Sequence, residues 1–322
     1  MKVLLVTSLS AIVASLSVRA APTNPPKGQQ PVSYYSLEYQ DNLVNTANKI
    51  KGSGLESHYD PELYVYPEMI EPGRLSIDCD TEAMKRDHSD VAQLYTPISQ
   101  QLPHENAWCA YKTGQGYVAS RTHFPGVTAE MIQWWLWWHS ASSERYSLWH
   151  PWAHVSVSSS YASKFNDSSL SNFDKLVGSV HDITEIIGDT SMDISIHWKN
   201  GSVFGLDESK FKDAGIVAWG FGEIYVPKGG PLKAVDMIHL WYQVEDGLEQ
   251  RSRYFLANNV HLDIPVLGDL IPVDQLGDLT GFKNLIVGRH LAHEQFTHDQ
   301  QEMTHLASIL PGVYKEFGPK AK

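Results

Sequence analysis

The chain of 322 residues contains little cysteine, little positive charge and only one long apolar run. Its two cysteines, Cys79 and Cys109, lack the C-x-x-C spacing of a redox or zinc site, so they form either one disulfide in an oxidising compartment or two buried thiols. Lysine and arginine number 25 against 37 acidic residues, and this net charge of −12 argues against nucleic-acid binding through a basic surface. The sequence has no internal repeat and, beyond the N-terminus, no segment suited to membrane insertion.

Histidine and tryptophan are the residues that the chain has in excess. With 42% hydrophobic and 19% charged residues, the composition is that of a globular protein and excludes a disordered chain. Within it are 15 histidines and 10 tryptophans. These residue types point to a site that uses imidazole chemistry and has aromatic walls.

The N-terminus has the pattern of a secretory signal peptide. Lys2 precedes an apolar stretch from Val3 to Val18, and Val18-Arg19-Ala20 is a cleavage site of the A-x-A type. We expect residues 1–20 to be removed and the mature protein to be secreted or lumenal. The alternative, a membrane anchor, is disfavoured because the stretch is short and interrupted by serines.

Two asparagine triplets agree with export. Asn166-Asp-Ser and Asn200-Gly-Ser are both acceptors for N-glycosylation, although such triplets also arise by chance. Together with the signal peptide, they predict a glycoprotein of the secretory pathway.

The pattern of the chain changes near residue 107 and divides it into two parts. Residues 21–106 are expected to form an N-terminal leader and a small subdomain, and residues 107–322 the catalytic domain. In the first part, the sequence predicts a helix over residues 81–94 with Asp80 as its N-cap. No strong catalytic pattern occurs there.

The second part has the pattern of an α+β fold. Thr128 is expected to cap a helix whose tryptophans, between residues 134 and 138, serve mainly core packing. From residue 154 to residue 265, alternation in some segments and β-branched and aromatic residues in others predict several antiparallel strands. A long helix is expected over residues 285–310, closed by Pro311. This order suggests a sheet that curls against the long helix.

The strongest chemical pattern lies in that last helix. His298 and Glu302 are four residues apart, so on a helix their side chains face one point, as the binding of a divalent metal requires. Taken alone, such a pair is more often a solvated ion pair. His154 opens an expected strand, and Glu185 is a carboxylate among isoleucines that needs a partner when buried. The two carboxylates of this set would balance the charge of a 2+ ion.

Five motifs between residues 107 and 316 form a specific combination. They are Trp134-Trp135…Trp138-His139, Arg145-Tyr-x-Leu-Trp-His-Pro-x-x-His154, Thr184-Glu-x-Ile-Gly188, Arg251-Ser-Arg-Tyr254 and His298-x-x-x-Glu302…Leu306-Ala-x-x-Leu-Pro-x-x-Tyr314. Together they resemble the family of 2,4-diacetylphloroglucinol hydrolase and phloretin hydrolase, zinc-dependent enzymes that hydrolyse a carbon–carbon bond. The familiar bacterial members of this family are intracellular, whereas this chain carries an export signal.

The resemblance implies a fold and a metal. The fold would be a Bet v 1-like helix grip, in which a curved antiparallel sheet surrounds a long C-terminal helix, preceded by a smaller N-terminal region. The metal would be Zn2+ held by two histidines and two glutamates, which correspond here to His154, Glu185, His298 and Glu302. Judged by its ligand types alone, such a set would also fit manganese or iron.

The resemblance also implies a reaction and the groups around its substrate. Tyr146, His239 and Tyr254 match the positions that surround the bound phenol, where they would hydrogen-bond the phenolic oxygens and transfer protons. As an alternative, they are buried polar groups satisfied by the backbone. The reaction would hydrolyse the bond between an acyl group and a polyhydroxylated, acylphloroglucinol-like ring, or a related β-diketone polyketide of secondary metabolism.

Two other functions fit the same residues. A lyase, isomerase or cyclase of secondary metabolism would keep the scaffold and the metal but would release no carboxylic acid. A non-enzymatic binder of hydrophobic phenolics would use the cavity of the fold and would need no metal. The sequence leaves open the acyl chain, the role of the metal and the oligomeric state, a homodimer being one alternative.

Overall fold

The structure, a computed structural model, describes residues 28–32, 35–263, 271–272 and 288–319. The predicted signal peptide, residues 1–20, lies outside the described residues, as do the first residues of the expected last helix, 285–287. Among the described helices, none combines the length and the apolar character needed to cross a membrane.

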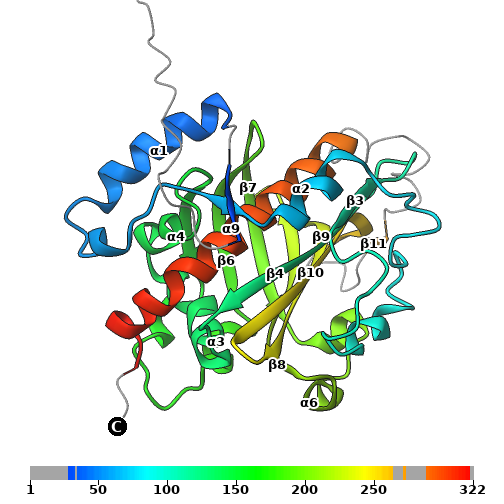
Figure 1. Cartoon of the computed structure of the whole chain (residues 1–322). Coiled ribbons are helices and arrows are strands. Elements are labelled where there is room, and N and C mark those ends of the chain that lie inside the picture. Colours follow the sequence, from blue (N-terminus) through cyan, green and yellow to red (C-terminus); the bar gives the residue numbers. More distant parts are fainter. Residues whose placement is uncertain (1–27, 33–34, 264–270, 273–287, 320–322) are drawn as a thin grey trace, which may run out of the picture.

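A large antiparallel sheet of nine strands forms the body of the protein (Figure 1). Its strands run in the order β3-β4-β10-β9-β8-β7-β6-β5, and β11 pairs with β10 off this path. The strands are β3 (Ala107–Ala110), β4 (Gly116–Pro125), β5 (His154–Ser159), β6 (Val180–Ile187), β7 (Thr190–Lys199), β8 (Ile216–Val226), β9 (Leu232–Val244), β10 (Gly247–Leu262) and β11 (Ile271–Pro272). A separate pair, β1 (Gln30–Pro31) and β2 (Tyr64–Val65), belongs to the N-terminal part.

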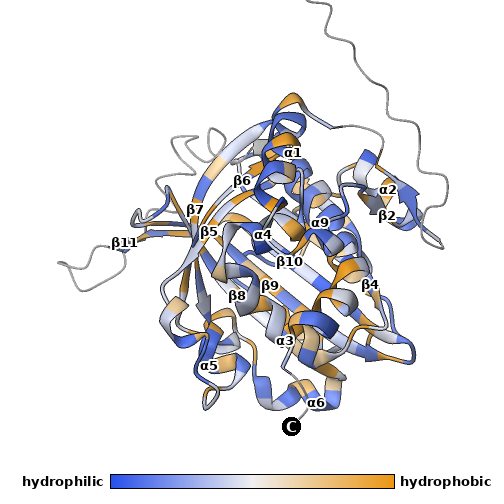
Figure 2. Ribbon diagram, turned by 90° about the vertical axis from the view of Figure 1, so that its left-hand side faces the viewer, coloured by the Kyte–Doolittle hydropathy of each residue, from blue (hydrophilic) through white to orange (hydrophobic). Residues whose placement is uncertain are grey.

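Helices cover one face of this sheet. The α-helices of the described residues are α1 (Leu37–Ile50), α2 (Pro67–Arg74), α3 (Ala129–Trp138), α4 (Ser143–Trp149), α5 (Asn172–Leu176), α6 (Phe211–Ala214) and α9 (Gly288–Phe317). The long helix α9 lies across the sheet and contacts β4, β3 and β6, with α3 and α4 beside it (Figures 1 and 2). The α+β class predicted from the sequence is therefore confirmed.

The centre of the sheet is buried on both faces. Along β9, Met237 and Trp241 belong to a hydrophobic cluster shared with the helices, whereas Ile238 and Leu240 belong to a second cluster on the opposite face. This division follows from the alternation of side chains along a strand. The second face is covered by irregular chain between residues 77 and 102 and by the segment 201–214.

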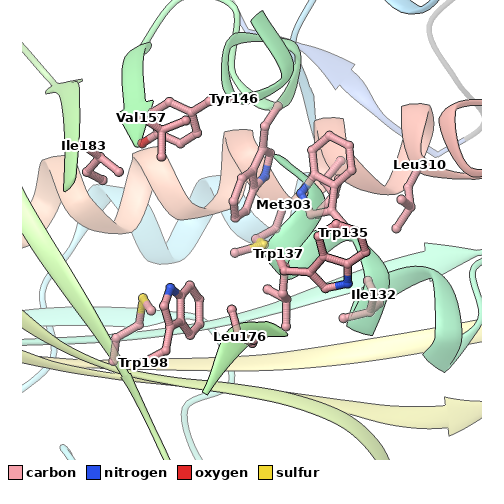
Figure 3. Packing of buried hydrophobic residues seen from close by; sticks show 14 of the residues in the cluster. Ile132, Trp135, Trp137, Tyr146, Val157, Leu176, Ile183, Trp198, Met303 and Leu310 are labelled. Atoms are coloured by element: carbon pink, nitrogen blue, oxygen red, sulfur yellow. The ribbon is translucent and has the colours of Figure 1, made fainter. Parts of the chain in front are cut away.

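The tryptophan-rich helix α3 forms as the sequence predicts. The Thr128 side chain caps it by accepting a hydrogen bond from the Met131 N–H group at 3.4 Å. Trp134 and Trp138 stack with their ring centroids 4.6 Å apart, and Trp135 is fully buried. Figure 3 shows Trp135 and Trp137 within the cluster between the sheet and α9. The prediction that these residues mainly pack the core is correct.

Two local predictions are wrong. Residues 81–94 form turns that lead into a short 3-10 helix, Val91–Tyr95, and no α-helix. The aspartates of this segment accept local backbone hydrogen bonds, for example Asp90 from Lys85 N–H and Asp87 from Ser89 N–H, and such bonds compete with a helix. The long helix does not close at Pro311 but continues to Phe317. The residues beyond the proline are packed, with Val313 fully buried, and this packing offsets the lost backbone hydrogen bond.

The N-terminal part contacts both edge strands of the sheet, β5 and β3. On one side, α1 packs on β5, and the Asn42 side-chain amide donates to the Trp152 carbonyl at 3.1 Å. On the other side, Cys79 forms a disulfide with Cys109 of β3, which decides between the two alternatives left by the sequence. The proposed domain boundary after residue 106 stays a prediction.

Candidate metal centre and adjoining cavity

Two strands and one helix bring the four predicted metal ligands together. His154 is the first residue of β5 and pairs directly with Glu185 on β6 at the edge of the sheet. His298 and Glu302 lie one turn apart on α9, which crosses above this edge. All four side chains are buried.

The distances within this cluster suit a tetrahedral metal. His154 Nε2 lies 3.3 Å from a Glu302 oxygen, and His298 Nε2 lies 3.7 Å from the same atom. One Glu185 oxygen is 3.8 Å from each of the two imidazole nitrogens. Ligands at about 2.0–2.1 Å from a tetrahedral zinc are about 3.4 Å from one another. His154, His298 and Glu302 form the compact group, with ligand atoms within 4.8 Å of one another, and Glu185 flanks it.

Neighbouring groups orient these side chains. His154 Nδ1 is 3.1 Å from the Tyr146 carbonyl, which leaves its Nε2 facing the cluster, buried and without a hydrogen-bond partner. The Tyr146 ring stacks on the His154 ring at 3.9 Å, and its hydroxyl donates to the flanking carboxylate of Glu185 at 2.9 Å. The unpartnered Nε2 is the atom that a metal would use.

Burial without a cation is costly for the charged form of every group in this cluster. It raises the pKa of Glu185 to about 7, against a lowering by the Tyr146 hydrogen bond, and raises that of Glu302 well above its usual range. Burial also lowers the pKa of His298 to about 3. A divalent metal binds neutral imidazoles and deprotonated carboxylates, and its positive charge would compensate the two buried carboxylates, so the donor set fits one.

A second polar cluster contains the other two predicted catalytic residues. His239 on β9 holds its Nδ1 at 2.8 Å from the Ser252 hydroxyl, and its Nε2 is 3.4 Å from the Tyr254 hydroxyl. The Tyr254 hydroxyl donates to Asp299 at 2.8 Å, and Ser120 donates to the other oxygen of this carboxylate. Burial lowers the pKa of His239 to about 3, so its imidazole is neutral.

Asp299 is the functional candidate that sequence reasoning missed. It follows His298 directly and is fully buried on α9. Burial raises its pKa to about 6, against the lowering effect of hydrogen bonds from Ser120 and Tyr254. Its position next to a proposed ligand was the only signal in the sequence, because its partners come from distant strands.

Both clusters open into one cavity of about 80 Å³. Isoleucine, valine and methionine side chains of β6–β9 form much of its wall, and the four predicted ligands, Tyr146, His239 and Tyr254 also line it. The further aromatic and imidazole side chains that line it are His139, Trp149, His181 and Trp198. The predicted aromatic walls therefore exist, although none of the tryptophans of α3 is among the residues that line the cavity. No pattern in the sequence singles out His181.

The remaining histidines near the cluster have structural contacts. His150 stacks on His298 at 5.1 Å and accepts from the Ala153 N–H group. His305 is held between two backbone carbonyls. His290 is exposed, and Glu294, one turn before His298 on α9, lies against Gly188.

Two enzymes are similar to this chain in sequence. The chain is 28% identical over 301 residues to 2,4-diacetylphloroglucinol hydrolase of Pseudomonas protegens, covering 92% of this chain and 94% of that one. It is 29% identical over 205 residues to phloretin hydrolase of Eubacterium ramulus, covering 63% and 69%.

Among solved structures, Ara h 8.0201 matches 58% of this chain and 99% of its own at 13% identity, with a TM-score of 0.28. The family described as the DAPG hydrolase PhiG domain matches residues 86–315, more than half of the chain. The protein therefore belongs to the DAPG hydrolase family.

Proposed function

We propose that this protein is a zinc-dependent hydrolase that cleaves the bond between an acyl group and a polyhydroxylated aromatic ring, or a related β-diketone polyketide. The observation that carries the proposal is the buried cluster of His154, His298 and Glu302, flanked by Glu185, at distances that suit a tetrahedral ion. Two carboxylates balance a 2+ charge. The names of the relatives and the mainly apolar cavity support a phenolic substrate.

The proposal includes a helix grip of the Bet v 1 type. Its support is the position of α9 across a large antiparallel sheet, with the cavity lined by residues from β6–β10 and from α9. Such an arrangement places helix side chains opposite strand side chains around one internal space.

The reaction must expel a carbon leaving group. The hydroxylated ring tautomerises by taking a proton at the carbon that bears the acyl group, which makes the substrate a β-diketone. Water adds to the acyl carbonyl, the carbon–carbon bond breaks, and its electron pair passes to the ring as an enolate that regains aromaticity. The products are a carboxylic acid and the deacylated phenol, so atoms balance with one water consumed.

The protein supplies the proton and the orientation for these steps. Tyr254 stays protonated because burial and Asp299 raise its pKa far above the usual range, so its hydroxyl can donate. Neutral His239 lies beside that hydroxyl and can accept a proton in turn. Tyr146 is likewise protonated through burial and its neighbour Glu185. A bound zinc ion would add Lewis acidity or activate water at neutral pH.

The first experiment measures metal content and acid release together. Mature protein purified without chelator or affinity tag is expected to hold about one zinc per chain by plasma mass spectrometry. The same sample should convert an acylphloroglucinol into one carboxylic acid per phenol released. Folded protein without metal would overturn the proposal, and substrate loss without acid would favour a lyase or cyclase.

We also propose that the protein is secreted or lumenal. The disulfide, together with the exposure of Asn166 and Asn200, supports passage through an oxidising, glycosylating compartment. Expression in a eukaryotic secretory host should yield a mature N-terminus at Ala21 and a mass that falls after glycosidase treatment. Retention of residues 1–20 would contradict this.

A further inference from the structure

The neighbours of His239 decide which of its two ring nitrogens carries the proton. The imidazole is buried, and burial lowers its pKa to about 3, so in the neutral ring one nitrogen donates and the other accepts. Its Nε2 lies 3.4 Å from the Tyr254 hydroxyl, and the ring lines the cavity. The proposed reaction needs a bare Nε2 that can accept a proton, so the groups around Nδ1 determine whether His239 can act.

Two buried side chains of β10 compete for Nδ1. The Ser252 hydroxyl is 2.8 Å from this nitrogen, and the Gln250 amide nitrogen is 3.3 Å from it. The two residues are two positions apart, so their side chains project from the same face of β10. An amide nitrogen can only donate. Gln250 therefore favours a bare Nδ1 and a protonated Nε2, which is the opposite of what the reaction needs.

Ser252 favours the other tautomer because its own proton is directed to Asp299. On the sheet, Ser252 pairs with His239 of β9 on one side and with Ser120 of β4 on the other. Asp299 of α9 accepts hydrogen bonds from Ser120 and Tyr254, and Ser252 is the third donor. A carboxylate oxygen only accepts, so the single proton of the Ser252 hydroxyl points to it. The hydroxyl oxygen is then left to accept from Nδ1–H.

Distance and charge decide this competition in favour of Ser252. Its contact with Nδ1, at 2.8 Å, is shorter than that of the Gln250 amide, at 3.3 Å. A hydrogen bond that ends on a charged group is roughly twice as strong as one between neutral groups, and the bond from Ser252 ends on a carboxylate. The Gln250 amide also has a second acceptor, the sulfur of Met303 at 3.3 Å, so it does not depend on the imidazole.

We propose that Ser252 is a positioning residue that holds His239 in the tautomer with a protonated Nδ1 and a bare Nε2. This inference rests on the proposed function, in which His239 accepts a proton in the cavity. When Nε2 takes up that proton, the imidazole becomes a cation that stays connected, through the Ser252 hydroxyl, to the carboxylate of Asp299. When Nε2 returns the proton, the chain of hydrogen bonds regains its starting state.

The tautomer can be measured directly by nitrogen-15 NMR of the imidazole rings in the purified protein without substrate. A protonated ring nitrogen resonates well upfield of a bare one, and the signals of His239 are those missing from the spectrum of His239→Gln. The wild type should show a protonated Nδ1 and a bare Nε2 on this residue. A protonated Nε2 in the wild type would overturn the inference before any variant of Ser252 is made.

Variants assign the tautomer to the Ser252 hydroxyl. In Ser252→Ala, the Gln250 amide is the remaining partner of Nδ1, so the proton should move to Nε2. Ser252→Thr keeps the hydroxyl group and should keep the wild-type tautomer. Ser120→Ala is the matched control, since the Ser120 hydroxyl is also buried and bonds Asp299, whereas its position on β4 separates it from His239 by a whole strand. An unchanged tautomer in Ser252→Ala, or the same reversal in Ser120→Ala, would overturn the inference.

Acid release connects the tautomer with the reaction and separates the two proposals. Ser252→Ala should lower kcat for acylphloroglucinol cleavage at least about 100-fold with little change in KM, because a protonated Nε2 cannot act as a base. Ser252→Thr should retain most of the activity. If the tautomer reverses in Ser252→Ala but even the wild type releases no acid, the hydrolase proposal fails and the positioning role stands. If the wild type releases acid and Ser252→Ala keeps both its tautomer and its kcat, the hydrolase stands and this inference is wrong.

Discussion

The hydroxyl group of Tyr254 on β10 donates a hydrogen bond of 2.8 Å to Asp299 on α9. Asp299 directly follows His298, and successive residues of an α-helix point about 100° apart. The same turn of α9 therefore presents one side chain to the metal cluster and the next to the phenol of Tyr254. This bond ties the two polar clusters of the cavity to a single helix.

Asp299 is expected to position Tyr254. Asp299→Ala leaves the phenol without its acceptor and should lower kcat for acylphloroglucinol cleavage by roughly 10–100-fold, while KM changes little. Asp299→Asn should retain more activity because the amide oxygen still accepts the hydrogen bond. Zinc content should stay unchanged in both variants. Parallel loss of metal and activity would show that Asp299 supports the cluster instead.

Much of this fold could be predicted from local patterns. Alternation in β5 and β7, and β-branched and aromatic residues in β8 and β9, identified strands, and the Thr128 cap marked the start of α3. Part of the ligand set could also be predicted from a local pattern, because His298 and Glu302 are spaced one helical turn apart. His154 at the start of an expected strand and Glu185 among isoleucines joined this pair as candidates, and the family motifs then pointed to the same four residues.

Contacts between distant segments could not be predicted. Alternation shows that His181 shares a face of β6 with Glu185, but it does not show that Trp198 stands beside it. The end of α9 depends on packing beyond Pro311, which no helix-stop rule includes. In residues 81–94, the apolar residues have a spacing that favours a helix. The turns form instead because aspartate side chains accept hydrogen bonds from nearby backbone N–H groups.

Metal binding should stabilise the fold in a way that depends on His298. Because the buried cluster exists only in the folded state, zinc at about a thousand times its Kd should add about 4 kcal/mol to the free energy of unfolding. Differential scanning calorimetry with and without chelator should show this as a higher Tm. In His298→Ala the difference should vanish, whereas in His290→Ala, an exposed histidine of the same helix, it should persist.

The disulfide should contribute to stability through the unfolded state. Cys79 and Cys109 are 30 residues apart, and closing a loop of this size is worth about 3.6 kcal/mol. In the double variant Cys79→Ser, Cys109→Ser, the free energy of unfolding should fall by this amount, which lowers the denaturant concentration at the midpoint. The zinc content should stay unchanged. Thiol titration of the unfolded, unreduced protein should detect no free cysteine. Detection of two thiols would contradict the disulfide.

Among the partly exposed carboxylates, we expect Glu105 to contribute most to the stability of the fold. It accepts hydrogen bonds from Arg251, at 2.7 Å from one guanidinium nitrogen, and lies 3.5 Å from Arg253. Both guanidinium groups are almost fully buried. Glu105→Gln would leave them without a counter-charge and should cost about 3–5 kcal/mol in urea unfolding. Glu249→Gln is the control, since its ion pair with Arg121 is more exposed and should be worth less than about 1 kcal/mol.

The same carboxylate gives this stabilisation a pH dependence with a defined sign. Burial alone would raise the pKa of Glu105, but the hydrogen bond from Arg251 and the charge of Arg253 outweigh it and lower the pKa below the usual 4.5. A lowered pKa in the folded state means that the stabilisation is fully present above about pH 4.5 and is lost as the pH falls through the folded value. The difference in unfolding free energy between wild type and Glu105→Gln should therefore be constant from pH 5 to pH 7 and shrink below pH 4.5. A difference that grows in acid would show that the pair does not stabilise the charged carboxylate, and the buried arginines would then need another partner.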